Sequence, residues 1–202
     1  METTSRVPPD NALISRLLAR RSVTSQSLSF PGPDSSQLCQ ILELASRVPD
    51  HGNLEPWRFI VLQGIEREQA SHDLAEIYAL EKLGMEPSRL ARFKGIIARL
   101  FTYAPVVVLV VASPQQSTVA TILEQHLSAG AVCMNLLTAV HALGFHGNWL
   151  SGWITSSAGA RGYFRLHGEE SFAGVIQIGT AAEIPHDRNR PDLNRIVTYW
   201  PG

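Results

Sequence analysis

Two amphipathic helices are predicted near the start of the chain, because hydrophobic residues recur there three and four positions apart. In the first helix these residues are Leu13, Ile14, Leu17 and Leu18. In the second they are Leu38, Ile41, Leu42 and Ala45. Asp10 can cap the first helix by accepting backbone N–H bonds, and Asp34 or Ser35 can cap the second. The first helix is expected to run into Arg20-Arg21-Ser22, and Pro49 to close the second.

Three segments have the composition of strands. Residues 57–62 are aromatic and β-branched, and Pro56 and Gly64 bound them. Residues 105–111 are continuously apolar, which a strand tolerates only where both of its faces are covered, so they are expected to form the central strand. Residues 174–178 predict a further strand.

Helical spacing returns between and after these strands. Residues 66–80 and 87–100 mix charged and apolar residues, as two partly exposed helices would. A long helix is predicted from about residue 118 to 143, and a shorter one over 158–166. Residues 144–152, rich in glycine and tryptophan, are expected to form a loop between them.

The order of these elements favours an α+β layout. Strands do not alternate strictly with helices, and no glycine fingerprint follows the first strand, so a Rossmann topology is disfavoured. The length of 202 residues suits one domain, residues 1–202. Residues 1–10 are polar and contain two prolines, which predicts a loose N-terminal arm and not a secretory signal.

A membrane-spanning helix has to be weighed for residues 127–150, which contain no Asp, Glu, Lys or Arg. Asn135, Thr138 and His141 interrupt this stretch, and no Lys/Arg cluster flanks it. A buried core helix is therefore the favoured interpretation, and no membrane contact is expected.

Charge and cysteine content narrow the function further. The formal net charge of −1 gives no reason to bind nucleic acid or an anionic bilayer. Cys39 and Cys133 lie outside any CxxC spacing, which suggests neither zinc nor a disulfide and favours a cytoplasmic location. Cys133 could in principle be a nucleophile, but its apolar helix favours a packed thiol. The seven histidines show no metal-ligand spacing, so no metal is expected.

Two basic clusters could bind a phosphate. Arg20, Arg21 and Ser22 follow a helix, where two guanidinium groups and a hydroxyl can donate charge-assisted hydrogen bonds. Arg188 and Arg190 form a second cluster in a polar, proline-containing tail. Taken singly, each cluster is also compatible with a solvated surface.

In their order and spacing, four segments of this chain resemble the nitroreductase family over most of its length. The first is Arg20-Arg21-Ser22, which matches an Arg-Arg-Ser-like element. The second, residues 48–59, echoes Ala-Pro-Ser-x-x-Asn-x-Gln-Pro-Trp-x-Phe as Val-Pro-Asp-His-Gly-Asn-Leu-Glu-Pro-Trp-Arg-Phe. Residues 128–131 and 144–152 match the start of the family's central helix and the loop after it. The Pro-Asp-His variant and the Trp-x-Ser-Gly loop resemble the compact single-domain subgroup.

This resemblance implies a nitroreductase-like fold, in which helices surround a central mixed, mostly antiparallel sheet. It implies an intertwined homodimer with FMN in the subunit interface and the long apolar helix buried against the partner. The C-terminal tail, residues 183–202, would reach the partner subunit. NADH or NADPH would be the reductant.

The resemblance also assigns roles to individual residues. Arg20, Arg21 and Ser22 would contact the phosphate side of FMN, with Arg188 and Arg190 as further phosphate contacts. The remaining cofactor-binding candidates are Arg47 and His51, reaching the flavin from the neighbouring subunit, and Trp149, Leu150 and Ser151, lying against it. No catalytic side chain is predicted, because FMN carries the hydride chemistry.

The expected activity is a ping-pong cycle in which NAD(P)H reduces the flavin and leaves, and a small-molecule acceptor takes the same space. Nitroaromatics, quinones or related conjugated compounds are the expected acceptors. The chain departs from the pattern at Glu55, which replaces a glutamine, at Leu150, where arginine is frequent, and at Thr24 and Ser25, where a basic residue is expected. Two alternatives follow: a flavin-binding protein of the same fold with little reductase turnover, and a cofactor-free dimeric interaction module.

Overall fold

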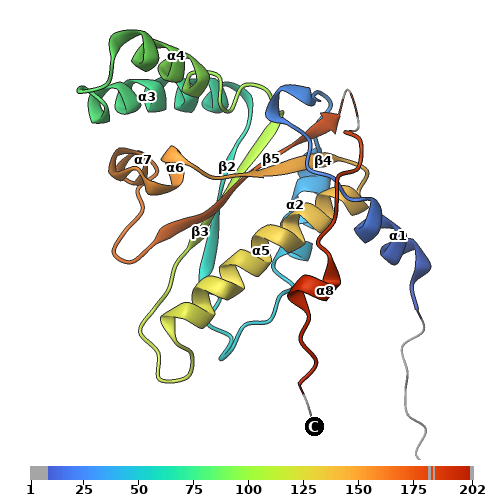
Figure 1. Ribbon diagram of the computed structural model, residues 1–202. Helices are drawn as coiled ribbons and strands as arrows, with labels where there is room; N and C mark the ends of the chain where they lie inside the picture. The colour runs from blue at the N-terminus through green and yellow to red at the C-terminus, as the bar shows by residue number, and fades with distance from the viewer. Residues whose placement is uncertain (1–8, 182, 184, 201–202) are drawn as a thin grey trace, which may run out of the picture.

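The computed structural model describes residues 9–181, 183 and 185–200, and its central sheet carries helices on both faces (Figure 1). The strands are β1 (Leu28–Ser29), β2 (Trp57–Leu62), β3 (Val106–Ala112), β4 (His146–Leu150) and β5 (Ser171–Ala181). The helices are α1 (Asn11–Ala19), α2 (Ser35–Ala45), α3 (Gly64–Glu81), α4 (Pro87–Ile97), α5 (Ile122–Ala142), α6 (Trp153–Ser156), α7 (Ala158–Tyr163) and α8 (Leu193–Ile196). A short 3-10 helix, Ser25–Ser27, precedes β1.

All strand pairings in this part of the chain are antiparallel. β3 lies between β2 and β5. Along its other edge, β5 pairs first with β4, from Val175 to Gly179, and then with β1, at Thr180 and Ala181. The predicted α+β class, with helices around a mostly antiparallel sheet, is confirmed, and the described strands show no parallel pairing that would make the sheet mixed.

β3 is the central strand, as its apolar run predicted. All seven of its residues are buried. Val107, Leu109 and Val111 pack into a cluster with side chains of α3 and α4. Val106 and Val108 pack on the opposite face with side chains of α2 and α5. Burying a valine or leucine side chain contributes roughly 1.5–3 kcal/mol, so the strand anchors both halves of the core.

The long helix α5 begins at Ile122, later than the predicted residue 118. Its N-cap is Thr121, whose side chain accepts a hydrogen bond from the backbone N–H of Glu124, while the Glu124 carboxylate accepts one from the Thr121 backbone. This capping box satisfies helix N–H groups that would otherwise lack partners. In the residues that the structure describes, no helix combines the length and apolar character needed to cross a membrane.

The loop predicted at residues 144–152 is wrong over most of its length, because residues 146–150 form β4. Gly147 makes this pairing possible: a Cβ atom there would lie 2.7 Å from the backbone oxygen of Gln177 on β5. Because glycine occurs at both ends of the segment, its sequence predicts a loop, although it forms a strand whose register depends on that close approach.

Several predicted ends shift by a few residues. α2 ends at Ala45, before Pro49, and α7 ends at Tyr163 where residue 166 was predicted. β5 is longer than residues 174–178 at both ends. The side chain of Asp10 caps α1, as predicted, by accepting from the Leu13 N–H at 3.0 Å. The predicted N-terminal arm falls mostly on residues 1–8, which lie outside the described residues.

Candidate cofactor site

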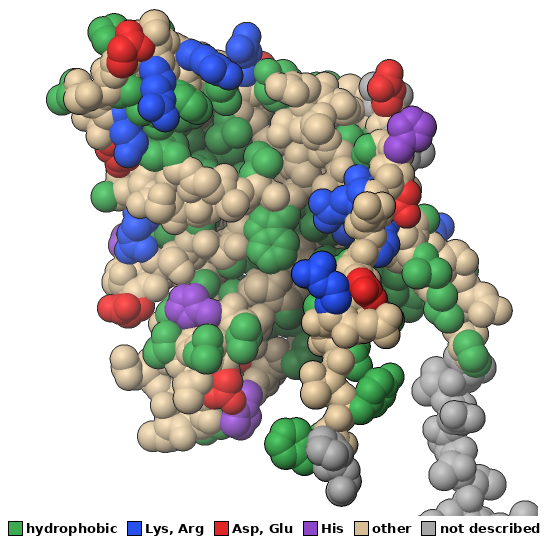
Figure 2. All heavy atoms as spheres, viewed as in Figure 1, with side chains coloured by type: hydrophobic (Ala, Val, Ile, Leu, Met, Phe, Trp, Pro, Cys, Tyr) green, Lys and Arg blue, Asp and Glu red, His purple; other side chains and the backbone are tan. Residues whose placement is uncertain are grey.

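The two basic clusters, far apart in the sequence, lie around one small pocket. Arg20 directly follows the last residue of α1, and the chain after β5 returns past the same place. The pocket, of about 70 Å³, is lined by Arg20, Arg21, Ser22, Arg188 and Arg190. We call it the arginine pocket. Figure 2 shows Lys and Arg side chains gathered there, over the C-terminal segment and beside α1.

Asp187 forms hydrogen bonds with arginines from both basic clusters of the arginine pocket. Its Oδ1 accepts hydrogen bonds from Arg190 Nη2 at 2.7 Å and from Arg21 Nη1 at 3.5 Å. The backbone N–H of Arg188, followed by the charges of Arg190 and Arg21, holds the pKa of Asp187 below its ordinary value. Asp187 was not among the predicted site residues, because a carboxylate in a polar tail carries no periodic signal.

The cations of the pocket are not fully compensated. Arg20 makes one long hydrogen bond, from Nη1 to Ser22 Oγ at 3.4 Å, and no carboxylate among the described residues pairs with it. Burial, followed by the charges of Arg190 and Arg188, lowers the pKa of Arg20. The Nε of Arg21 is buried without a hydrogen-bond partner. An anion would reduce the repulsion and satisfy that donor, so these residues suit a phosphate group.

Trp149, Leu150 and Ser151 lie at the end of β4 and just beyond it. The indole of Trp149 lies close over Gly174 of β5, where a Cβ atom would be 2.4 Å from its Nε1, and 40% of Trp149 is exposed. Leu150 packs against the hydrophobic cluster on the α3 side of the sheet. Ser151 is exposed. Trp149 therefore offers a partly exposed aromatic face at the sheet edge, while Leu150 points to the opposite face of the sheet.

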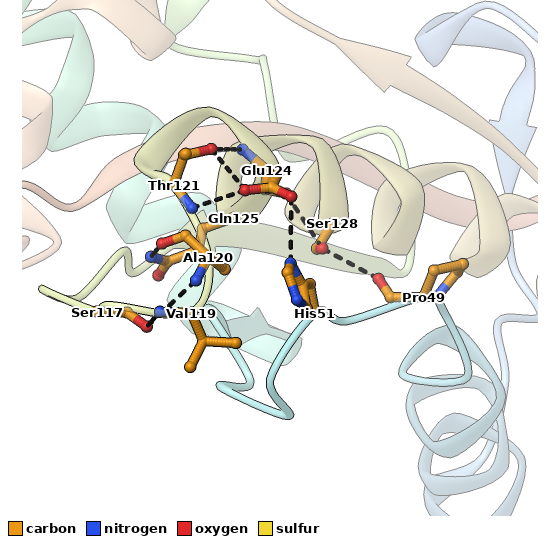
Figure 3. A network of polar contacts seen from close by, with 9 residues as sticks. All are labelled: Pro49, His51, Ser117, Val119, Ala120, Thr121, Glu124, Gln125 and Ser128. Carbon is orange, nitrogen blue, oxygen red and sulfur yellow. Dashed lines mark hydrogen bonds and ion pairs between the residues drawn. The ribbon is translucent and has the colours of Figure 1, made fainter.

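Arg47 and His51 are not brought to the arginine pocket within one chain. His51 lies under the first turn of α5, where its Nδ1 is 3.2 Å from Glu124 Oε1 (Figure 3). His141, beside Arg20, lies near the other end of α5, about 25 Å away at 1.5 Å per residue. Arg47 is exposed after α2, and its backbone oxygen accepts a hydrogen bond from an α5 side chain.

The segment that carries His51 is held in a defined shape. Ser128 Oγ donates to the Pro49 oxygen at 3.0 Å, and the Asp50 carboxylate accepts from the Glu55 N–H at 2.7 Å. Glu55 adopts a positive φ of 48°, which costs energy for a residue with a side chain. Hydrogen bonds from the Thr121 backbone and hydroxyl, and then from His51, lower the pKa of Glu124 to about 2. The ionised carboxylate thus stays available to the imidazole.

Comparison with known proteins identifies the family. The sequence pattern of the Nitroreductase family matches residues 17–180. YdjA of Escherichia coli (strain K12), assigned as an NAD(P)H nitroreductase, is 31% identical over 188 residues, which cover 91% of this chain and 97% of YdjA. This chain belongs to the nitroreductase family. A Haemophilus influenzae protein with the same assignment is 33% identical over 180 residues, covering 87% of this chain and 94% of that protein. The predicted enzyme class, an oxidoreductase, is thereby confirmed.

Solved structures show the nitroreductase-like fold. A nitroreductase-like family protein from Bacillus cereus superimposes with a TM-score of 0.79 at 18% identity, covering 98% of this chain and 100% of that one. A protein of Desulfovibrio desulfuricans, assigned as a nitroreductase and solved in complex with FMN, gives a TM-score of 0.70 at 23% identity, covering 96% and 99%.

The thiol of Cys133, a candidate nucleophile in the sequence, is buried in α5. Burial raises the pKa of Cys133 to about 12, so its thiol stays protonated near neutral pH, as a packed thiol would. Among the described residues, no group of three or more His, Cys, Asp or Glu side chains is placed to hold a metal ion.

Proposed function

We propose that this protein is an FMN-dependent oxidoreductase that works as a homodimer and takes electrons from NADH or NADPH. Its acceptors would be nitroaromatics, quinones or related conjugated compounds. The observation that carries the proposal is the arginine pocket, where Arg20, Arg21 and Ser22 meet Arg188 and Arg190. Support also comes from the relatives assigned as NAD(P)H nitroreductases and from the family member solved with FMN.

The residues of the arginine pocket would hold the phosphate of FMN. Guanidinium groups donate paired, charge-assisted hydrogen bonds that match phosphate oxygens. The uncompensated charge of Arg20 and the partnerless Nε of Arg21 both favour a ligand of this kind. Asp187 would orient the arginines from the solvent side, since its side chain is 67% exposed and already contacts two of them.

When bound, FMN supplies hydride transfer between NAD(P)H and the acceptor. The chain itself contributes position and an aromatic wall: the partly exposed Trp149 would flank the site and restrict water, Leu150 would anchor this end of β4 in the core, and Ser151 would offer a hydroxyl at the edge of the site. A ping-pong order is expected, because the nicotinamide and the acceptor would use the same open space next to this wall.

A second copy of the chain would complete the site. His51 can reach an arginine pocket only if that pocket belongs to another subunit, because the length of α5 separates them within one chain, and Arg47 does not line the pocket of its own chain. α5 itself carries an uncovered apolar stripe: Leu123 is 68% exposed and Leu127 64%, and nothing lies within 4 Å of a Cβ atom built on Gly130. Such a stripe is typical of an interface.

The C-terminal tail would add to this interface. Among the described tail residues, Leu193, Ile196, Tyr199 and Trp200 are all largely exposed. A short helix, α8, that buries none of its residues within its own chain is expected to pack elsewhere. Each subunit would then be one nitroreductase-like domain, residues 1–202, whose segment 183–202 reaches the partner. A cytoplasmic location belongs to the same proposal, since Cys39 and Cys133 are both free thiols.

A flavin-binding protein with little reductase turnover is the second candidate. Leu150 packs into the core, where related chains frequently carry an arginine, and Thr24 and Ser25 are neutral. Fewer cations near the flavin would stabilise its anionic reduced form less. A cofactor-free module is less well supported, because it gives the uncompensated arginine pocket no role.

The visible spectrum and the elution volume of the purified protein, with FMN added, test the proposal. We expect flavin absorbance to co-elute with a dimer. Rapid anaerobic mixing with NADH and with NADPH should then bleach that absorbance before an acceptor restores it. A protein that binds FMN but is not bleached would be the second candidate. A protein that stays colourless with excess FMN would contradict both.

A further inference from the structure

A larger pocket adjoins the arginine pocket and has no role in the function proposed above. It has a volume of about 320 Å³ and lies between α1, the end of α5 and the start of β4. Its lining consists of Arg16, Ala19, Arg20, Arg21, Val23, His141, Gly144, Phe145 and His146. Arg20 and Arg21 line both pockets, so the two share a wall. We call the larger one the histidine pocket. Its volume lies within the range of small-molecule sites, roughly 300–1,000 Å³.

The charge of the histidine pocket is strongly one-sided. Three arginines line it and no carboxylate does, although the whole protein has a formal net charge of −1. Neither Arg16 nor Arg20 belongs to an ion pair with another described residue. The carbonyl groups at the C-terminal end of α5 contribute a negative potential here. Arg16 partly neutralises it, because its Nη1 donates a hydrogen bond to the backbone oxygen of His141 at 2.9 Å. The remaining guanidinium N–H groups stay available to a ligand.

Each of the two histidines has a ring nitrogen without a hydrogen-bond partner among the described residues. Their rings meet edge to face, with centroids 5.5 Å apart. His141 Nε2 and His146 Nδ1 are both buried without a partner among the described groups. Buried polar atoms are normally satisfied, and an imidazole nitrogen accepts a hydrogen bond when it carries no hydrogen and donates one when it does. Two such rings among three guanidinium groups match a ligand that brings oxygen atoms and negative charge.

We propose that the histidine pocket is a second phosphoryl-binding subsite, which takes a phosphate other than that of FMN. It rests on the proposed function only in assigning the first phosphate to the arginine pocket. A phosphate group has the required charge and enough oxygen atoms for guanidinium and imidazole groups together. Three sources share this chemistry: the diphosphate of FAD, continuing from the first phosphate across Arg20 and Arg21, the 2′-phosphate of NADPH, and free phosphate.

Three measurements on the purified dimer distinguish these sources. Calorimetric titration with inorganic phosphate and pyrophosphate, with and without bound FMN, reports on free phosphate. The dissociation constants of FAD and FMN, compared on the unloaded protein, report on the diphosphate. The KM values of NADPH and NADH report on the 2′-phosphate. Each is repeated with Arg16→Ala and His146→Gln, which line the histidine pocket and not the arginine pocket, and with Arg99→Ala as a matched control on an exposed surface.

We expect one measurement to show a preference for the additional phosphate, and both variants to weaken it about tenfold, as loss of one charge-assisted hydrogen bond would. FMN affinity should stay unchanged in both. The proposal would be overturned if FAD bound no more tightly than FMN, NADPH had the same KM as NADH, and neither inorganic phosphate nor pyrophosphate bound. It would also be overturned if Arg16→Ala and Arg99→Ala weakened binding equally. If FMN does not bind at all, the proposed function is wrong, but titration with pyrophosphate still tests whether the histidine pocket binds phosphoryl groups.

Discussion

Arg190 donates a hydrogen bond from Nη2 to the backbone oxygen of Leu18 at 3.3 Å, joining positions 172 residues apart. The contact fixes the returning C-terminal segment against the last turns of α1. Arg20 follows α1 directly, so the geometry of the arginine pocket depends on this junction. Two segments without a hydrophobic core of their own are thereby brought to one pocket.

Substituting Arg20→Ala or Arg190→Ala should weaken FMN binding about 10-fold to 100-fold. Each substitution removes a charge-assisted contact, and such contacts contribute about 1.5–3 kcal/mol. Fluorescence titration of FMN measures the effect. Arg190→Lys should lie between wild type and alanine, because lysine keeps the charge but not the planar fork. Unchanged FMN affinity in all three variants would remove the basis of the proposed phosphate site.

The sequence predicted those elements whose hydrophobic pattern is complete in itself. β3 was found because seven consecutive apolar residues need cover on both faces. β4 was missed, because its pairing depends on the approach of Gly147 to β5 and not on a local pattern. The arginine pocket followed from a family resemblance, whereas Asp187 and the histidine pocket depend on how α1, α5 and the tail meet. No local sequence pattern predicts how these three segments pack together.

Gly130→Leu should convert the proposed dimer to a monomer. Apart from the neighbouring backbone of α5, no described residue lies within 4 Å of a Cβ atom at Gly130, so we expect a single subunit to tolerate leucine there. Its side chain would protrude from the exposed stripe of α5 and hold off a second copy. Size-exclusion chromatography should show a later elution, and bound flavin should be lost with it.

Gly95→Leu is the matched control for that experiment. Gly95 lies in α4 and also has nothing within 4 Å, so it adds the same side chain to another helix. Dimers in both variants would show that the stripe on α5 is not the interface. Monomers in both would mean that the effect is not specific to α5.

Gly174→Ala should displace the indole of Trp149. The added Cβ atom would lie 2.4 Å from Nε1 of Trp149 and 3.0 Å from Sγ of Cys133. Because 40% of Trp149 is already exposed, we expect the ring to move outward and the core to relax, at a cost of about 1–3 kcal/mol. Tryptophan fluorescence should shift to longer wavelength, and acceptor turnover should fall.

Trp149→Phe identifies the tryptophan responsible. In that background, Gly174→Ala should produce no fluorescence shift, although Trp57, Trp153 and Trp200 still emit. Gly162→Ala is the control for backbone effects, because a Cβ atom at Gly162 meets nothing within 4 Å. A shift that persists in the Trp149→Phe background would show that another tryptophan moves.

Glu170→Gln should lower the free energy of unfolding by about 1–3 kcal/mol at neutral pH. The Glu170 carboxylate accepts from Arg58 Nε at 2.7 Å and Nη2 at 2.8 Å, and from Ser113 Oγ at 2.6 Å. Arg58 is the main cause that lowers the pKa of Glu170 to about 2. Its stabilisation is therefore complete above the ordinary value of 4.5 and is lost as pH falls towards 2. Urea unfolding at several pH values should show this acid-side slope in wild type and a flatter one in Glu170→Gln.

His141 should make the protein less stable in mild acid. Burial, followed by the positive charges of His146, Arg20 and Arg16, lowers the pKa of His141 from 6.5 to about 4. Between these two values the unfolded chain binds a proton that the folded chain does not, so stability is complete above pH 6.5 and declines as pH falls towards 4. In His141→Gln the unfolded chain can no longer bind this proton. Urea unfolding in phosphate-free buffer should therefore show a smaller loss of unfolding free energy between pH 7 and pH 5 than in wild type. The exposed His167→Gln is the matched control. Equal pH slopes in wild type and His141→Gln would show that His141 is not held neutral by its surroundings.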